Sequence, residues 1–365
     1  MTLLAGLLAA ASTANGAQNN VWVRGAFPGF EVYSDAPIAD IEGNLRDLQL
    51  LNAFVRALWP QIAEDEARPV SLLIVPSKQE YADLIGERTL PPRAAGFRTL
   101  LGNHPMALIK TWSGEWTMFD RALGVHLSQS PWLNFVTQSF LACCLMRRVG
   151  ERPPSWLYAG MFKLISGALC SDGDIELPPV TRGAPARFVP LKALLGDDHP
   201  QIQQFSYDCN TRVIFLFSGL RPDRRGTEVR TVLMDGTIRP FWATLPFGPF
   251  ADESYDFVTF GLLGERGRYR RQFIRFAESA ASGPVDEANF QQVFGMSYDQ
   301  MLQLLRTHTE AVKAQIFRWA APDSLPARLR FLPANPRQVD ARLREWRQRF
   351  ADPVQRAEGE AFLLK

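Results

Sequence analysis

Histidine and cysteine, the residues that most often bind zinc, are scarce in this sequence of 365 residues. The four histidines are His104, His126, His199 and His308. They do not form a set with the spacing of metal ligands, such as two imidazoles one turn apart on a helix. The four cysteines are Cys143, Cys144, Cys170 and Cys209. None forms a C-x-x-C pair, so a zinc ribbon is not indicated. The sequence alone does not decide whether Cys170 and Cys209 form a disulfide.

Signatures of nucleotide binding and acyl transfer are also missing. The chain contains no G-x-S-x-G, no G-x-x-x-x-G-K and no G-x-G-x-x-G. The formal net charge of +2 provides no strong basic field, which argues against a nucleic-acid partner. Hydrophobic residues make up 46% of the chain and charged residues 21%, values that are typical of a packed globular protein.

No apolar run is long enough to span a bilayer. The N-terminal run Leu3–Ala11 has small and polar residues after it, as in a secretory signal that is cleaved after Ala14 or Ala17. No Lys or Arg precedes this run, which is atypical, and a short tail remains the alternative. We therefore expect residues 1–17 to be a signal peptide and the chain to be exported, without a transmembrane segment.

The first third of the chain predicts a sheet and a long helix. Two strands around the turn Pro28-Gly29 precede a helical stripe of apolar residues that ends at Leu58. A strand over Val70–Val75 and a helix over Lys78–Ile85, capped by Ser77, follow. Three further strands are predicted at Gly96–Arg98, Met106–Thr111 and Ala122–Leu127.

The middle of the chain predicts two helices joined by a turn. The segment from Trp132 to Val149 is apolar on nearly every side, which is typical of a buried helix. Gly150 and the pair Pro153-Pro154 end it, and a second helix begins near Ser155 and ends near Ser166.

The second half of the chain predicts mostly helices. A hairpin around Asp172-Gly173 is too short for an EF-hand calcium loop. Cys209–Leu220 is a buried helix or strand, and Arg239–Phe250 is a packed loop. Helices follow over Asp252–Ser282 and Asn289–Ala311. Prolines interrupt the tail before two short helices, which are too few to establish a repeat.

The turn PPSWLYAG resembles the active-site turn of gluzincin metallopeptidases of the peptidase MA-like (DUF1570-type) group. The matching residues are Pro154, Trp156, Leu157 and Gly160. The stretches RPVSLLIVPSKQEY, AAGF and GRYR match other parts of that family in the same order, so the resemblance covers about residues 20–315. It implies an α+β, zincin-like fold: an N-terminal mixed sheet with a long helix, a buried core helix pair and a helical C-terminal half.

The zinc ligands of that family are missing here. The family's His-Glu-x-x-His falls on residues 137–141, so Thr137 and Leu141 stand in place of the histidines and Gln138 in place of the general base. Ala159 stands in place of the glutamate that completes the site. The only acidic residue between Trp132 and Cys170 is Glu151, in the turn. Because a zinc hydrolase needs three ligands and a base, we expect no metal, cofactor or catalytic residue at this place.

Four segments follow from these patterns. They are the signal peptide 1–17, a peptidase-like subdomain 18–185, a mainly helical subdomain 186–320 and a helical tail 321–365. The resemblance implies an exported pseudopeptidase that binds a peptide or protein or serves as a structural module. The alternative is an active hydrolase with non-standard ligands, which would need side chains such as His126, Asp252 and Glu253 to converge near Gln138.

Overall fold

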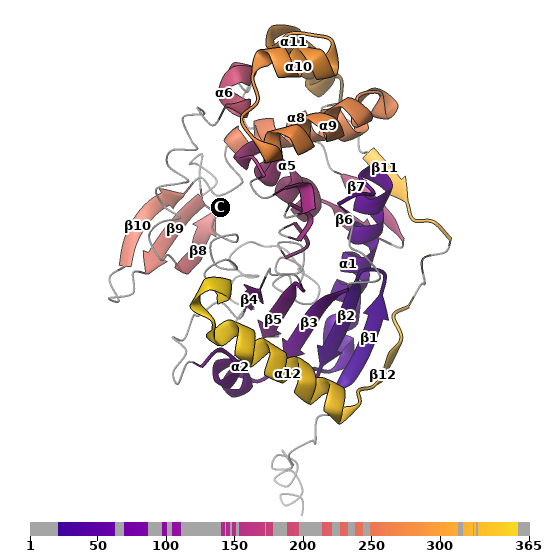
Figure 1. The fold of residues 1–365 in the computed structure, drawn as a ribbon, viewed down its shortest axis with the longest axis vertical. Coiled ribbons are helices and arrows are strands. Elements are labelled where there is room, and N and C mark those ends of the chain that lie inside the picture. Colours follow the sequence, from indigo (N-terminus) through magenta and orange to yellow (C-terminus); the bar gives the residue numbers. More distant parts are fainter. Residues whose placement is uncertain are drawn as a thin grey trace, which may run out of the picture.

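A six-stranded mixed sheet lies at one end of the molecule (Figure 1). Its strand order is β12-β1-β2-β3-β5-β4. The three neighbouring strands β2, β3 and β5 run parallel, and the remaining pairs are antiparallel. The strands are β1 (Val23–Phe27), β2 (Phe30–Ser34), β3 (Val70–Val75), β4 (Phe97–Leu100), β5 (Met106–Lys110) and β12 (Phe331–Pro333).

The computed structural model describes most of the chain between residues 21 and 356. The described ranges are 21–62, 69–86, 97–100, 104–110, 140–142, 144–146, 148–150, 153–171, 173–177, 188–196, 214–220, 227–232, 238–243, 249–312, 317–323, 325 and 328–356. Among these residues, no helix is both long enough and apolar enough to cross a membrane.

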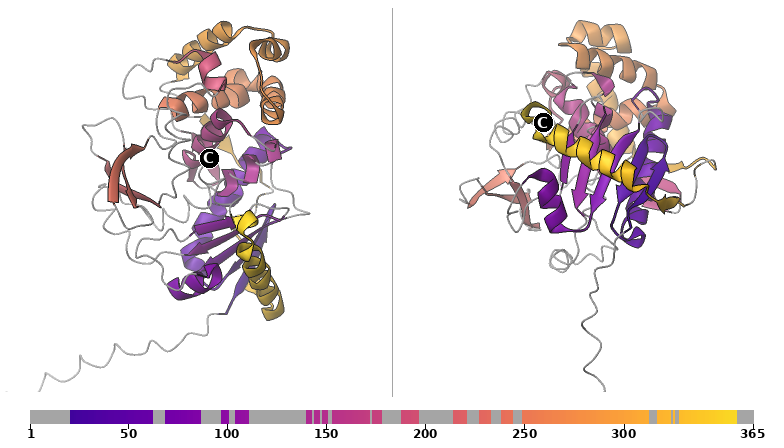
Figure 2. Two further views of the ribbon diagram at one scale, coloured as in Figure 1. Left: turned by 60° about the vertical axis from the view of Figure 1, so that its left-hand side comes forward. Right: turned by 60° about the horizontal axis from the view of Figure 1, so that its bottom comes forward.

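Successive side chains of a strand point to opposite faces of the sheet, and both faces of this sheet are buried. On β3, Leu72 and Ile74 belong to the large core that contains α1 (Ile38–Leu58). Leu73 and Val75 belong to a second core on the opposite face. Helices α2 (Lys78–Ile85) and α12 (Pro336–Ala351) cover this second face, and Figure 2 shows α12 crossing the strands. The six-stranded sheet is therefore the middle layer of three.

A helical layer packs above α1. The helical residues 140–142, 144–146 and 148–149 and α5 (Ser155–Ser166) share one core with α8 (Pro249–Gly267) and α9 (Arg270–Ser282). Trp156 of α5 is fully buried, with its ring centroid 5.2 Å from that of Phe257 and 6.1 Å from that of Phe273. Helices α6 (Leu191–Leu195), α10 (Glu287–Phe294) and α11 (Tyr298–Val312) complete this layer. The α+β class expected from the sequence is confirmed.

Two small sheets accompany the main one. The first has the order β11-β7-β6, with β6 (Leu169–Ser171) and β7 (Asp174–Leu177) forming the hairpin expected there. Its third strand is β11 (Phe317–Ala320), which pairs with β7. The second has the order β10-β9-β8. Its strands are β8 (Ile214–Leu220), β9 (Thr227–Val232) and β10 (Ile238–Ala243).

Several elements differ from what the sequence pattern indicates. The packed loop predicted over Arg239–Phe250 is wrong, because residues 238–243 form β10. The prolines that favoured a loop are compatible with an outer strand, whose N–H groups need no partner on one side. For Cys209–Leu220 the sequence left helix and strand open, and the described part, residues 214–220, is a strand. The strand predicted at Ala122–Leu127 lies outside the described residues.

The C-terminal tail belongs to the N-terminal sheet. Strand β12 pairs with β1, and Val339, Trp346 and Phe350 of α12 lie in the second core. Pairing of β11 with β7 likewise crosses the boundary drawn at residue 185. The prolines before this segment indicated a separate tail. Proline ends a helix, but it permits an extended segment that pairs with a distant strand.

Candidate functional site

The described part of the expected zinc position lies in two elements: Leu141 in the buried helical segment that precedes α5, and Ala159 in α5. Leu141 is fully buried in the main core, and Ala159 is only 6% exposed. Neither side chain carries an atom that can bind a metal ion. Thr137 and Gln138 lie outside the described residues, as does His126. Two of the family's three ligand positions therefore have no donor, so these residues do not fit a zinc ion.

Gly160, next to Ala159, allows α5 to approach α8 closely. A Cβ atom on Gly160 would lie 2.5 Å from Cγ2 of Val258 and 2.6 Å from the carbonyl oxygen of Ser254. Real Cβ atoms do not approach other atoms so closely, so only glycine fits without movement of a backbone. The glycine that the family resemblance identified has a packing function here.

Polar side chains of α8 contact α5 and the segment before α6. Lys163 of α5 forms an ion pair with Asp252, and its Nζ lies 5.8 Å from the centroid of the Tyr255 ring. Glu253 is 3% exposed and accepts a hydrogen bond of 3.1 Å from the backbone N–H of Val189. Burial raises the pKa of Tyr255 to about 12, which keeps its hydroxyl protonated. Asp252 and Glu253, named as alternative ligands, thus have structural partners.

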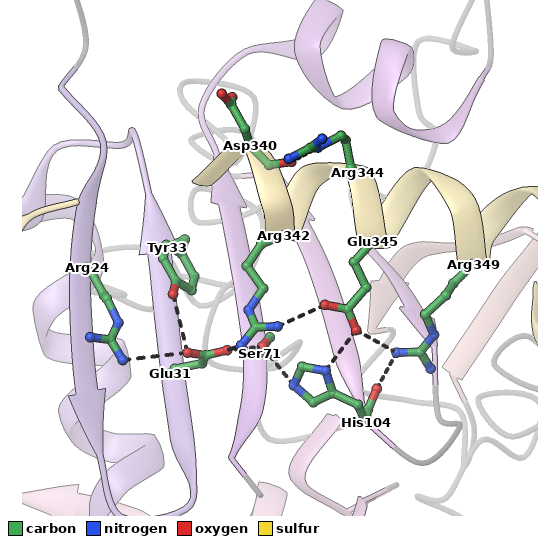
Figure 3. A network of polar contacts seen from close by, with 10 residues as sticks. All are labelled: Arg24, Glu31, Tyr33, Ser71, His104, Asp340, Arg342, Arg344, Glu345 and Arg349. Carbon is green, nitrogen blue, oxygen red and sulfur yellow. Dashed lines mark hydrogen bonds and ion pairs between the residues drawn. The ribbon is translucent and has the colours of Figure 1, made fainter. Parts of the chain in front are cut away.

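A second polar cluster lies between the six-stranded sheet and α12, away from the expected zinc position (Figure 3). Glu31 of β2 is 4% exposed, and its Oε1 lies 2.6 Å from Nη2 of Arg342 and 2.6 Å from Oγ of Ser71. Nη2 of Arg24 lies 3.7 Å from Oε2 of the same carboxylate. A buried carboxylate needs such compensation, because desolvation alone would disfavour its charge.

His104 links this carboxylate to α12. Its Nε2 lies 3.1 Å from Oγ of Ser71, and its Nδ1 lies 2.9 Å from Oε1 of Glu345. Nη1 of Arg342 donates a hydrogen bond of 2.9 Å to Oε2 of Glu345. Nη1 of Arg349 donates to the carbonyl oxygen of His104 at 2.5 Å. We call Arg24, Glu31, Ser71, His104, Arg342, Glu345 and Arg349 the α12 network.

The electrostatics of the α12 network favour its charged forms. Burial raises the pKa of Glu345, but the hydrogen bonds from His104 and Arg342 outweigh burial and hold this pKa below its ordinary value. Burial lowers the pKa of Arg342, but the carboxylates of Glu31 and Glu345 outweigh it and raise this pKa. Both side chains are therefore ionised at neutral pH.

Ser71 contacts His104, and His104 contacts Glu345, as serine, histidine and carboxylate do in the catalytic triad of a hydrolase. Ser71 cannot act as a nucleophile, however. The side chain of Ser71 is fully buried, and its hydroxyl proton is donated to Glu31. Its backbone N–H donates to the carbonyl oxygen of Pro105 within the sheet and is not available to stabilise an oxyanion. A triad needs an accessible serine whose proton passes to the histidine. The arrangement is structural.

Sequence patterns do not single out the residues of the α12 network, although two of them leave a signal. Glu31 is the one charged residue of β2 and Ser71 the one polar residue of β3, and both lie on the face that α12 covers. A buried polar residue needs a hydrogen-bond partner, and that partner can lie far away along the chain. His104 and Glu345, for example, are 241 residues apart. No local pattern predicts which segment provides it.

Other candidate residues do not assemble into a site. His308 of α11 packs edge-on against Phe260, and burial lowers its pKa against an opposing effect of Glu265. Cys170 is a free thiol, and its pKa is raised to about 12 by burial and then by Asp47. Cys209 and His199 lie outside the described residues. Within the described residues, no group of three or more His, Cys, Asp or Glu side chains could hold a metal ion.

Comparisons of this chain with protein-family models, with curated proteins and with solved structures found no match.

Proposed function

We propose that this chain is an exported pseudopeptidase: a gluzincin-like fold that has lost its zinc site and binds a peptide or protein without cleaving it. The observation that carries the proposal is the full burial of Leu141 in the main core, where the family has a zinc-binding histidine. The order of sheet, long helix α1, buried helix and α5 agrees with the resemblance. The apolar run Leu3–Ala11 supports export.

Apolar side chains replace two of the family's zinc ligands. A buried histidine needs a metal ion or a hydrogen-bond partner, whereas leucine needs only apolar neighbours. Leu141 has those neighbours, and Ala159 leaves no carboxylate to complete a site. The fold therefore keeps its stability without zinc.

The alternative, a metallopeptidase with non-standard ligands, has less support. Asp252 is paired with Lys163, and Glu253 accepts the N–H of Val189. Releasing either carboxylate to a metal ion would leave a buried or half-buried donor without its acceptor. Such a site would have to recruit most of its ligands outside the described residues.

Zinc content tests the loss of the site. After incubation with zinc and desalting, we expect far less than about one zinc per chain and no rise in melting temperature on addition of zinc, because a bound metal would stabilise the folded state. About one tightly held zinc per chain would refute the pseudopeptidase.

Binding without cleavage is tested with fluorescein-labelled, unfolded casein. Fluorescence anisotropy should rise on titration with the protein, and gel electrophoresis should show the casein intact after prolonged incubation. Cleavage that a chelator stops would favour the metallopeptidase. An unchanged anisotropy would refute the binding of unfolded polypeptide that we propose.

A further inference from the structure

His104 is placed where it can control how firmly α12 is held. It precedes β5 and contacts the sheet through Ser71 on one side and α12 through Glu345 on the other. Its own carbonyl oxygen accepts the hydrogen bond from Arg349. The histidine side chain is 28% exposed, so solvent protons reach it.

The hydrogen atoms of the α12 network can be counted. Ser71 has one hydroxyl proton, which it donates to Glu31 at 2.6 Å, so it offers only a lone pair to Nε2 of His104. Glu345 is ionised and can only accept, so Nδ1 of His104 must carry a proton. Both contacts of His104 are hydrogen bonds only when both ring nitrogens are protonated. A neutral imidazole has one proton and loses one of the two bonds.

We propose that His104 is a pH-responsive clasp that holds α12 on the six-stranded sheet, complete when the imidazole is protonated and weaker when it is neutral. Histidine is the side chain whose charge ordinarily changes between about pH 5 and 8. Since a neutral imidazole keeps only one of the two hydrogen bonds, we expect docking of α12 to weaken when His104 loses its proton.

Charged groups of both signs face His104. Glu345 and Arg349 face it from α12, and Ser71 faces it from β3. Glu31, with Arg342, Arg24 and Tyr33 around it, lies behind Ser71. Because its pKa is depressed, Glu345 contributes stability above about pH 4.5 and loses it only in stronger acid, below the range of the clasp.

Other parts of α12 keep it attached when the clasp is weak. Nε1 of Trp346 donates to the carbonyl oxygen of Leu84, and its ring is fully buried. Arg342 remains paired with Glu31 at every pH at which both are charged. The expected effect of the clasp is thus a local loosening of α12 and not global unfolding.

Hydrogen exchange of the α12 amides tests the clasp in the full chain. After correction for intrinsic exchange rates, protection of α12 should be roughly three- to tenfold higher at about pH 5.5 than at about pH 7.5, the effect of one hydrogen bond. In His104→Gln this pH step should vanish. In the control His308→Gln, altered in α11, the step should remain.

Three outcomes overturn the proposal. One is an equal pH step in wild type and His104→Gln, and another is a wild type without a step or with the opposite sign. If His104→Gln loses α12 protection at both pH values, Ser71→Ala decides: it keeps the contact of His104 with Glu345 but removes the need for a proton on Nε2. The pH step should shrink in Ser71→Ala, and an unchanged step refutes the clasp.

Discussion

Gly160 shows how a single residue sets the distance between two helices. A side chain there would meet Cγ2 of Val258 and the backbone oxygen of Ser254 within 2.6 Å. The carbonyl oxygen belongs to a helix backbone and cannot rotate away as a side chain does. The packing of α5 on α8, and with it the position of Ala159, depends on this glycine.

Gly160→Ala should lower the free energy of unfolding by roughly 2 kcal/mol, because the added methyl group overfills the helix contact. The matched control is Gly43→Ala in α1, where a Cβ meets no atom within 4 Å. That change should instead stabilise the chain by about 0.5–1 kcal/mol, since alanine favours a helix over glycine. Urea unfolding of both variants checks the pair, and equal stability would show that the helices can separate at no cost.

Among the elements, α12 combines apolar and charged contacts with the sheet. Val339, Trp346 and Phe350 lie in the second core, while Arg342, Glu345 and Arg349 form the α12 network. Apolar contacts have little directional preference, so they bind the helix to the sheet without defining its rotation. The ion pairs and hydrogen bonds define it, because Arg342 and Arg349 reach their acceptors in the sheet only in one rotation of the helix.

Arg342→Ala should destabilise the chain by roughly 3 kcal/mol, because it leaves the buried carboxylate of Glu31 with only the more distant Arg24 as a cationic partner. The control Arg344→Ala, on the exposed side of α12, should cost less than about 0.5 kcal/mol. Denaturant unfolding measures both. A loss of similar size in the two variants would mean that the ion pair with Glu31 contributes nothing special.

On the scale of the whole molecule, a pair of carboxyl groups makes stability depend on pH. Asp35 follows β2, and its pKa is raised to about 7, chiefly by burial and then by Glu80 in the first turn of α2. A carboxyl group with a raised pKa contributes its full stability below its ordinary value of 3.8, and that contribution is lost as the pH rises through about 7. The folded chain therefore favours the protonated form of Asp35.

Asp35→Asn should make the free energy of unfolding fall less between about pH 5 and 8 than it does in the wild type, because asparagine has no proton to lose. The control Asp40→Asn, at an exposed position in the first turn of α1, should keep the wild-type profile. Urea unfolding across this range tests the difference. Both variants keep His104, so its contribution cancels. A wild-type profile in Asp35→Asn would contradict the assignment.

The sequence by itself determined the local elements of this protein. Helical periodicity, the cap at Ser77 and the stop at Gly150 predict α1, α2 and the core helix pair, and the Pro28-Gly29 turn predicts the first hairpin. Each of these depends on residues a few positions apart, so the pattern is visible in the chain. The missing histidines were also visible, since a ligand requires a residue type that is not there.

Only the tertiary structure decided what those elements pack against. It brings α12 onto the sheet, β12 beside β1, and Glu345 within 2.9 Å of a histidine 241 residues earlier. Glu31 was recognisable as a charged residue in a largely apolar strand, but its partner Arg342 comes from a segment that proline breaks made look separate. Buried polar groups require partners without specifying where in the chain the partners lie, so local patterns could not identify this network.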